Sequence, residues 1–310
     1  MPDPVISVRG LRKSYGRVEA VRSIDLDVER GEIFAFLGPN GAGKTSTVEI
    51  LEGYRGRSAG EVSVLGVDPA RADREWRGRI GIVLQDSDMH PELTVREALA
   101  MFAGYYPAPR PVDETIERVG LREKADARVR TLSGGQKRRL DVGLALVGDP
   151  ELLFLDEPTT GFDPTARRRA WDVIASLREL GKTVFLTTHY MDEAQHLADR
   201  AAIIAAGQIV AHGAPDDLGD RERQPASITF RLPAGTDAAE LPPELGASHE
   251  LQNGLVKLSS TAPVPLLNTL TGWALERDIQ LEALEVRHPS LEDVYLALTS
   301  EPAAEKEAPQ

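Results

Sequence analysis

The feature that most constrains the fold is a glycine-rich segment, residues 38–45, with the sequence GPNGAGKT. It fits the pattern G-x-x-x-x-G-K-[ST] at every fixed position. The apolar run EIFAFLG before it predicts a buried strand, and residues 45–54 after it predict a helix. A plain glycine turn with a solvated lysine would not need this strand-loop-helix context. We therefore predict a phosphate-binding loop, whose backbone N–H groups surround an anion at the start of a helix.

The chemistry of this loop predicts a bound nucleotide and a magnesium ion. Lys44 supplies a positive charge to the β and γ phosphates, and the Thr45 hydroxyl is suited to Mg²⁺. The expected nucleotide-binding residues in the loop are Gly38, Pro39, Asn40, Gly41, Ala42, Gly43, Lys44, Thr45 and Ser46.

A second motif, Asp156-Glu157, follows the apolar run LLFL. Asp156 is a candidate ligand in the Mg²⁺ shell, and Glu157 is a candidate base that orients and deprotonates an attacking water. Taken alone, such a carboxylate pair could equally cap the next turn. Its place downstream of the phosphate-binding loop favours the catalytic interpretation.

The hydrophobic pattern predicts an α/β fold with a largely parallel sheet, because strands and helices alternate. Residues 6–11 and 23–28 alternate as half-buried antiparallel strands do, and residues 86–148 are mostly helical, with Thr94 and Glu97 as a capping box. Pro164 and Gly181 delimit a further helix. We expect an ATPase-type first domain at 1–218, a linker at 219–226, a small α+β domain at 227–300 and a disordered tail at 301–310. Within the small domain, the expected strands are 227–232, 254–258 and 279–286, and the expected helices are 264–277 and 290–298.

Composition excludes several classes of protein. The chain has 310 residues, 41% of them hydrophobic, and no cysteine, so disulfides and thiolate zinc sites are excluded. A net charge of −13 gives no global attraction to nucleic acid. The N-terminus lacks a signal-peptide pattern, and no apolar run approaches the roughly 18 residues that span a bilayer.

The segment Leu132-Ser133-Gly134-Gly135-Gln136 matches the LSGGQ signature, and by it the chain resembles the ABC ATPases from about residue 5 to 215. The resemblance implies a P-loop NTPase core with an antiparallel β part and an inserted helical subdomain. It also implies a homodimer in which this segment contacts ATP held by the opposite protomer. Ser133, three residues before Gln136, is in addition the N-cap of a helix.

Other residues match the family pattern in the expected order. The resemblance implies that Gln85 contacts Mg²⁺ or the lytic water, and that His189 contacts the γ-phosphate. It further implies that Tyr15 stacks on adenine and that Asp163, which could also cap the helix begun by Pro164, lies at the dimer interface. Phe162 replaces the leucine usual before that aspartate, a conservative apolar change. The basic stretch 137–139 is interpreted as a solvated helix face.

The motifs TTHYMDEA and HPSLEDVYLALT resemble those of the drug-resistance ATPases of the daunorubicin-exporter type. That resemblance implies export of a drug-like or hydrophobic compound with ATP and Mg²⁺, and a separately encoded membrane permease as partner. It places the chain on the cytoplasmic face of the membrane, bound only through the permease, with no nucleic-acid partner.

Two alternatives to export differ from it in features that a sequence can show. One is a soluble ABC ATPase that acts on ribosomes or DNA. Translation-factor types carry two cassettes, chromosome-maintenance types a long coiled coil, and repair types zinc modules, and none of these features is present in the sequence. The other is a regulator without turnover, which the presence of both Glu157 and His189 disfavours.

Overall fold

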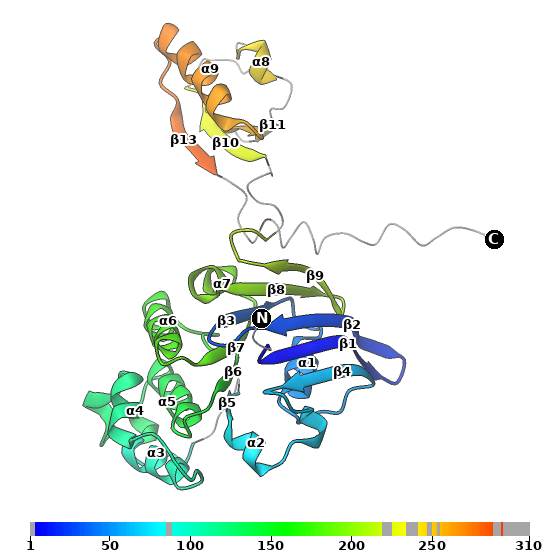
Figure 1. Cartoon of the computed structure of the whole chain (residues 1–310). Coiled ribbons are helices and arrows are strands. Elements are labelled where there is room, and N and C mark those ends of the chain that lie inside the picture. The colour runs from blue at the N-terminus through cyan, green and yellow to red at the C-terminus, as the bar shows by residue number, and fades with distance from the viewer. Residues whose placement is uncertain are drawn as a thin grey trace, which may run out of the picture. The chain divides into compact units, whose positions relative to one another are not determined.

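The computed structural model describes residues 4–84, 89–218, 225–233, 241–246, 250–252, 255–287 and 293. The chain divides into two compact units, Met1–Pro215 and Asp216–Gln310 (Figure 1). Most of the expected linker 219–226, nearly all of the expected helix 290–298 and the tail 301–310 lie outside the described residues.

The first unit begins with an antiparallel sheet of β1 (Ile6–Tyr15), β2 (Val18–Val28) and β4 (Ala59–Val64), in the order β2-β1-β4. Ile6 lies opposite Val28 on one side and Val64 on the other, and all three are buried. Alternate residues of these strands therefore face the core, as the alternating sequence pattern predicts.

The central sheet of this unit has the order β5-β6-β7-β3-β8-β9. Its strands are β3 (Ile33–Leu37), β5 (Ile80–Val83), β6 (Leu152–Asp156), β7 (Thr183–Thr188), β8 (Arg200–Ala205) and β9 (Gln208–Gly213). All pair in parallel except β9, which is antiparallel to β8. The carboxyl ends of β3, β6 and β7 therefore meet at one edge, where loops of α/β sheets bind ligands.

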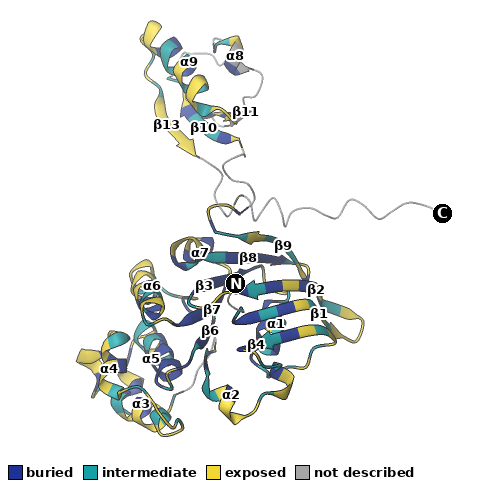
Figure 2. Cartoon of the chain, in the orientation of Figure 1, coloured by how far each residue is buried: buried dark blue, intermediate teal, exposed yellow. Residues whose placement is uncertain are grey.

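The core lies between the two sheets and α1 (Lys44–Leu51). The ring of Phe185 lies 5.6 to 5.8 Å from those of Phe34, Phe36 and Phe154 at the centre of the parallel sheet. Figure 2 shows these strands as buried, whereas the helices at the margin carry exposed faces. The parallel strands thus read as nearly continuous apolar runs because both faces are covered.

Helix α1 ends at Leu51, three residues before the predicted end at 54. Gly53 adopts a φ of +79°, and a Cβ there would approach the Pro69 carbonyl oxygen within 2.8 Å. A glycine with positive φ just past the last turn ends a helix, so the local backbone overrides the apolar pattern.

The remaining helices of the first unit separate into two groups in Figure 1. Helices α3 (Val95–Ala103), α4 (Val112–Arg118) and α5 (Gly134–Leu146) form the helical part, and Thr94 and Glu97 make the expected capping box of α3. Helices α6 (Pro164–Glu179) and α7 (Met191–Leu197) follow β6 and β7, and α2 (Arg74–Gly78) precedes β5. Short 3₁₀ turns cover Pro69–Arg71, Arg122–Lys124 and Val129–Thr131.

The second unit is an antiparallel sheet with the order β11-β12-β10-β13 and a packed helix. Its elements are β10 (Ala226–Arg231), α8 (Pro243–Gly246), β11 (Glu250–Gln252), β12 (Leu255–Ser260), α9 (Pro263–Glu276) and β13 (Glu282–Arg287). Trp273 and Leu270 of α9 share a buried cluster with Ile228 and Phe230 of β10. The α+β class expected for this unit is therefore observed.

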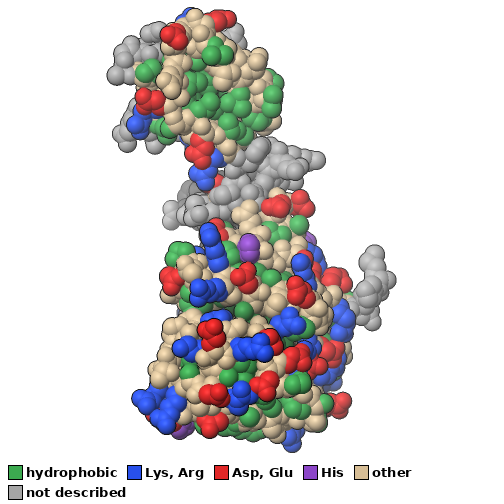
Figure 3. Space-filling view, turned by 90° about the vertical axis from the view of Figure 1, so that its left-hand side faces the viewer, with side chains coloured by type: hydrophobic (Ala, Val, Ile, Leu, Met, Phe, Trp, Pro, Cys, Tyr) green, Lys and Arg blue, Asp and Glu red, His purple; other side chains and the backbone are tan. Residues whose placement is uncertain are grey.

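Hydrophobic side chains gather on the face of the second unit shown in Figure 3. Its exposed large apolar residues include Val264 and Leu275 on α9 and Leu284 and Val286 on the edge strand β13. Across the described parts of both units, no helix has the length and apolarity needed to cross a membrane.

Candidate nucleotide-binding site

The glycine-rich loop joins β3 to α1 and is pressed against two neighbouring strands. Gly41 and Gly43 have φ values of +81° and +110°. A Cβ on Gly43 would lie 2.5 Å from the Ala20 carbonyl oxygen, and one on Gly38 would lie 2.5 Å from that of Ile204. Only glycine fits such close approaches without displacing the backbone.

The N-terminus of α1, the helix that follows the loop, has N–H groups available to bind an anion. Gly43 is the N-cap of α1 and supplies no side-chain cap to its first turn. The first N–H groups of a helix need partners, and phosphate oxygens supply them at a site of positive helix dipole. The loop therefore fits the phosphates of a nucleotide.

Lys44 is buried at the start of this helix, with 7% of its surface exposed. Its Nζ donates hydrogen bonds to the carbonyl oxygens of Gly38 at 2.7 Å and Pro39 at 3.2 Å. Burial lowers the pKa of Lys44, and the carboxylates of Glu157 and Asp156 oppose that shift. A buried ammonium held by carbonyls of its own loop is placed to receive a phosphate.

Glu157 lies just past β6 in a left-handed conformation with φ of +44°, which is uncommon for a residue with a Cβ. Its N–H donates to the Thr187 side-chain hydroxyl at 3.0 Å, which holds the turn against β7. Oε1 lies 3.8 Å from Lys44 Nζ and 3.3 Å from His189 Nδ1. The structure thus brings together the three catalytic candidates that follow β3, β6 and β7.

Asp156 ends β6 and accepts a hydrogen bond from the Thr187 hydroxyl. In the described part of the chain, no group of three or more His, Asp or Glu side chains could hold a metal alone. Magnesium at a nucleotide is commonly held by one or two protein oxygens together with the phosphates. The Asp156 carboxylate and the exposed Thr45 hydroxyl supply oxygens of that kind, so these residues fit Mg²⁺.

Tyr15 lies at the end of β1 with 40% of its surface exposed. Its hydroxyl lies 3.1 Å from the Ser46 hydroxyl in α1, so its ring stands beside the phosphate-binding helix. Lys13 Nζ lies 4.9 Å from the ring centroid. A half-exposed ring in this place offers a stacking face for a base.

The signature segment begins a different helix. Ser133 accepts from the Gln136 N–H at 3.3 Å, and Gln136 accepts from the Ser133 N–H at 2.9 Å, a reciprocal cap of α5. Asp163 accepts from the N–H groups of Thr165 and Ala166 and caps α6. None of these contacts reaches Lys44, Glu157 or His189. Within one chain, the hydrogen bonds of these caps are therefore local to their own helices.

Gln85 lies outside the described residues, so its predicted contacts remain a prediction. The preceding residue, Leu84, offers its carbonyl to Arg138. Arg138 also donates to the carbonyls of Asp156 at 2.6 Å and Pro158 at 3.2 Å.

Arg138 corrects the interpretation of residues 137–139 as a solvated helix face, because it is only 8% exposed. Its guanidinium reaches carbonyls at the ends of β5 and β6, partners distant in the sequence. A run of three basic residues does not reveal which of them turns inward. Arg138, Thr187 and the buried Glu193 are functional candidates that the sequence reasoning did not single out, although Thr187 and Glu193 lie within the segment TTHYMDEA.

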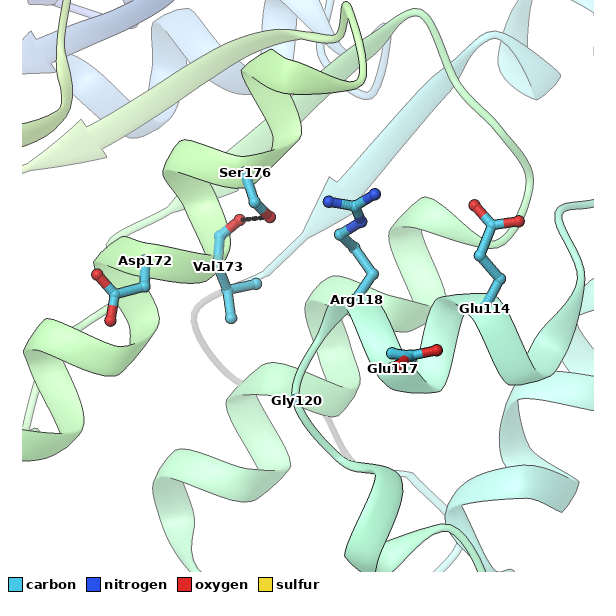
Figure 4. Close-up of a pocket in the computed structure, with 7 residues that line it drawn as sticks. All are labelled: Glu114, Glu117, Arg118, Gly120, Asp172, Val173 and Ser176. Carbon is cyan, nitrogen blue, oxygen red and sulfur yellow. Dashed lines mark hydrogen bonds between the residues drawn. The ribbon is translucent and has the colours of Figure 1, made fainter.

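A separate hollow of about 340 Å³ lies between α4 and α6 (Figure 4). Its lining includes Glu114, Glu117, Arg118 and Asp172, and Figure 4 shows these side chains on facing helices. None of the candidate nucleotide-binding residues lines it. We therefore do not include it in the site.

Two family models match the chain. The model described as ABC transporter matches residues 21–160, which include the glycine-rich loop, the signature and Glu157. The model described as the C-terminal domain of ABC transporter domain-containing protein-like sequences matches residues 226–290.

Curated relatives match almost the whole chain. Daunorubicin resistance ATP-binding protein DrrA3 of Streptomyces coeruleorubidus is 38% identical, with 99% of this chain and 100% of the relative covered. Nod factor export ATP-binding protein I of Burkholderia lata is 40% identical over 96% and 98% of the two chains. The same protein of Rhizobium meliloti is 41% identical over 96% and 89%.

Solved structures show the same fold for the first unit. The cbiO1 protein of Clostridium perfringens, part of the ABC transporter complex cbiONQ, is 28% identical with a TM-score of 0.63 over 69% of this chain and 90% of its own. The dimeric ATP-binding cassette MJ0796 bound to ADP and Pi is 24% identical with a TM-score of 0.60 over 68% and 98%, and this likeness concerns the fold. The chain therefore belongs to the ABC transporter family, as one of its ATP-binding, ATP-hydrolysing subunits.

Proposed function

We propose that this subunit drives the export of a drug-like or hydrophobic compound through a separately encoded membrane permease. Similarity over nearly the full length to proteins named for daunorubicin resistance and Nod factor export supports export. It also favours this function over a soluble ABC ATPase that acts on ribosomes or DNA. The observation that carries the ATPase chemistry is the convergence of Lys44 and His189 on the Glu157 carboxylate.

In this proposal, the loop residues 38–46 bind the ATP phosphates and Tyr15 stacks on adenine. Thr45, Asp156 and Gln85 would hold Mg²⁺, which when bound neutralises charge on the phosphates. Lys44 leaves its loop carbonyls for the phosphates and offsets the rest of their charge.

Glu157 acts as the base for the attacking water. Its Oε2 accepts a hydrogen bond from the Thr160 hydroxyl at 3.1 Å, which leaves Oε1 directed at Lys44 and His189. A water placed between Oε1 and the γ-phosphate would lose its proton to Glu157 as it attacks. His189 lies on the same side and would contact the γ-phosphate, so the attacking water and the phosphoryl group that it attacks are held together, while ADP is the leaving group.

The opposite protomer of the homodimer completes each site. Ser133 and Gly134 are exposed at the N-terminus of α5, where a helix attracts an anion. In the proposed dimer, the Ser133–Gln136 segment contacts the γ-phosphate held by the partner, and Asp163 lies at the same interface. ATP then closes the dimer because it binds the closed form more tightly, and hydrolysis reopens it.

The permease would dock in a groove between α1, α2 and α3, here called the α1–α3 groove. It combines a hollow of about 370 Å³ with one of about 1030 Å³, which share Arg77 and Tyr106. Tyr54 is 72% and Tyr105 is 65% exposed at its walls. Ile82 of β5 also lines the groove, and β5 leads to Gln85. Movement of a docked segment would therefore reach the nucleotide site through Gln85.

The charge distribution agrees with a protein partner rather than nucleic acid. The net charge is −13, and Figure 3 shows acidic and basic side chains interspersed over the visible face of the first unit. On that face, the charges form no continuous basic track of the kind that a phosphate backbone requires. Because the chain is similar to ATP-binding proteins named for export and drug resistance, we assign the subunit to the cytoplasmic face of the membrane, held there by the permease.

Co-purification from detergent-solubilised membranes of the native host tests this function. We expect the tagged chain to carry with it a multi-span membrane protein, and Tyr54→Ala or Tyr105→Ala in the groove to reduce its recovery. Leu275→Ala, at a residue 82% exposed on α9, serves as a control outside the groove. Recovery of ribosomal or DNA-bound proteins in place of a permease would overturn the transport function and leave the ATPase chemistry intact.

A further inference from the structure

We propose that Glu193 is a positioning residue, which fixes the candidate base Glu157 and His189 relative to each other. This inference rests on the ATPase chemistry of the proposed function. Glu193 lies in the first turn of α7, four residues after His189, and is 0% exposed. A carboxylate is costly to bury, so a fully buried one is expected to have a specific task.

The hydrogen bonds of Glu193 join three separate elements. Its Oε1 accepts from the Thr159 hydroxyl at 2.8 Å and from the Trp171 indole N–H at 3.2 Å. Burial raises the pKa of Glu193, and the donors Thr188, Thr159 and Trp171 oppose that shift. One oxygen atom thereby ties the turn after β6 and helix α6 to helix α7.

Two of the residues that oppose the pKa shift lie within two positions of a candidate site residue in the chain, and the third lies in a helix that a candidate site residue caps. Thr159 follows Glu157 by two positions, and the fully buried Thr159 leaves that turn little freedom. Thr188 directly precedes His189, and its hydroxyl accepts the N–H of Tyr190 at 2.9 Å. Trp171 lies in α6, which Asp163 caps. A shift of Glu193 would therefore move Glu157, His189 and Asp163 relative to one another.

Further contacts lock α6 against α7 around this carboxylate. The Arg167 guanidinium lies 4.3 Å from the centre of the Tyr190 ring, and the Trp171 ring stacks on His196 at 4.8 Å. On its other side, α6 packs against α5, the helix that begins at the signature segment: a Cβ added to Gly135 would lie 3.4 Å from the Ala166 Cβ. Helix α6 thus contacts the signature segment on one side and α7, the helix that follows His189, on the other. The hydrogen bonds of Glu193 fix the position of α6 relative to α7 and to the turn after β6.

The distance of 3.3 Å between His189 Nδ1 and Glu157 Oε1 depends on these hydrogen bonds of Glu193. Small displacements of reacting groups slow an enzyme strongly, even when the substrate still binds. The phosphate-binding loop lies between β3 and α1 and makes none of these hydrogen bonds with Glu193. Loss of Glu193 should therefore reduce kcat and leave ATP affinity largely unchanged.

The test compares Glu193→Ala, Glu193→Gln and Asp192→Asn in the full-length chain purified from host membranes. Glu193→Ala removes the acceptor, and we expect kcat to fall about tenfold or more with ATP affinity retained. Glu193→Gln keeps an oxygen that can accept both bonds, so it should restore most of kcat. Asp192 is the exposed carboxylate one position earlier and its variant should behave as the wild type.

Unchanged kcat in Glu193→Ala, or a loss confined to ATP affinity, would overturn the positioning role. If Glu193→Ala does not fold, Trp171→Phe provides the test, because it removes the indole donor but keeps the aromatic stack. We expect a smaller fall in kcat for it, about threefold for one bond lost, and an unchanged kcat would again overturn the role. Glu157→Gln separates the two proposals: normal turnover there contradicts the catalytic assignment itself, whatever Glu193 does.

Discussion

At the scale of single residues, Glu52 stands out because it is a buried carboxyl group that the charge of Asp156 reaches. It follows α1, is 6% exposed, and lines the α1–α3 groove. Burial raises the pKa of Glu52 from 4.5 to about 8, and the charges of Asp156 and Glu49 add to the shift. The folded protein therefore keeps a proton on Glu52 at neutral pH.

This protonation predicts a pH-dependent cost in stability. Unfolded glutamate loses its proton near pH 4.5, whereas the folded protein holds it until about pH 8. Folding is thus disfavoured progressively across that window, by a total on the order of a few kcal/mol, and the cost stays constant above it. Glu52→Gln should remove the cost and raise the unfolding midpoint at pH 8.5 more than at pH 5, measured by thermal denaturation. Equal gains at both pH values would contradict it, and the exposed Glu61→Gln is the control.

The sequence identified those site residues that belong to short motifs, in which the spacing of neighbouring residues indicates the chemistry. Lys44, Glu157 and His189 belong to three separate motifs, and the parallel order of β3, β6 and β7 explains why they meet. Arg138 and Glu193 were not identified because their partners lie far away in the chain. Arg138 bonds to the carbonyl of Pro158, and Glu193 to the side chain of Trp171. Such pairs become visible only when the fold is known.

At the scale of elements, helices α3 and α5 both begin with a capping box, but only the cap of α5 belongs to the candidate ATP-binding site. Thr94 and Glu97 cap α3, and Ser133 and Gln136 cap α5, each with reciprocal hydrogen bonds. A lost cap of this kind costs about 1 kcal/mol of stability. Both Thr94→Ala and Ser133→Ala should therefore lower the unfolding midpoint to a similar extent.

Only the second cap should matter for turnover, because we assign Ser133 a contact with ATP. Steady-state ATP hydrolysis measured on both variants should stay near wild type in Thr94→Ala and fall in Ser133→Ala. Equal activities in the two variants would show that Ser133 acts as a helix cap alone. The comparison thus separates the structural duty of the signature from its proposed catalytic one.

The elements themselves were predictable where hydrophobic periodicity is strong. The buried strands β3 and β6 and helix α6 match the predicted segments, and α6 begins at Pro164 with Asp163 as its cap. The elements β11 and α8 were not predicted, because three or four residues carry no periodic pattern. The end of α1 was misplaced because Gly53 turns the backbone before the apolar pattern stops.

At the scale of the whole molecule, the chain divides into two units, and the candidate nucleotide-binding residues lie in the first. The first unit holds the phosphate-binding loop, Glu157, His189 and the signature segment, whereas the second has its own buried core around Trp273. The second unit matches a C-terminal domain of ABC transporter-like proteins. The candidate nucleotide site can therefore be described from the first unit alone, and in our proposal the permease selects the exported compound.

In the proposed homodimer, ATP binds between two copies of this chain, with Lys44 of one and Ser133 of the other on the same nucleotide. The most direct measurement is the mass of Glu157→Gln in solution, by light scattering after gel filtration, with ATP and with ADP. Without its base, the variant should hold ATP and remain dimeric, whereas ADP should leave it monomeric. Adding Ser133→Arg should abolish the ATP-dependent dimer, because a bulky cation then fills the place of the phosphate contact. A monomer under all conditions, or a dimer indifferent to Ser133→Arg, would contradict the shared site.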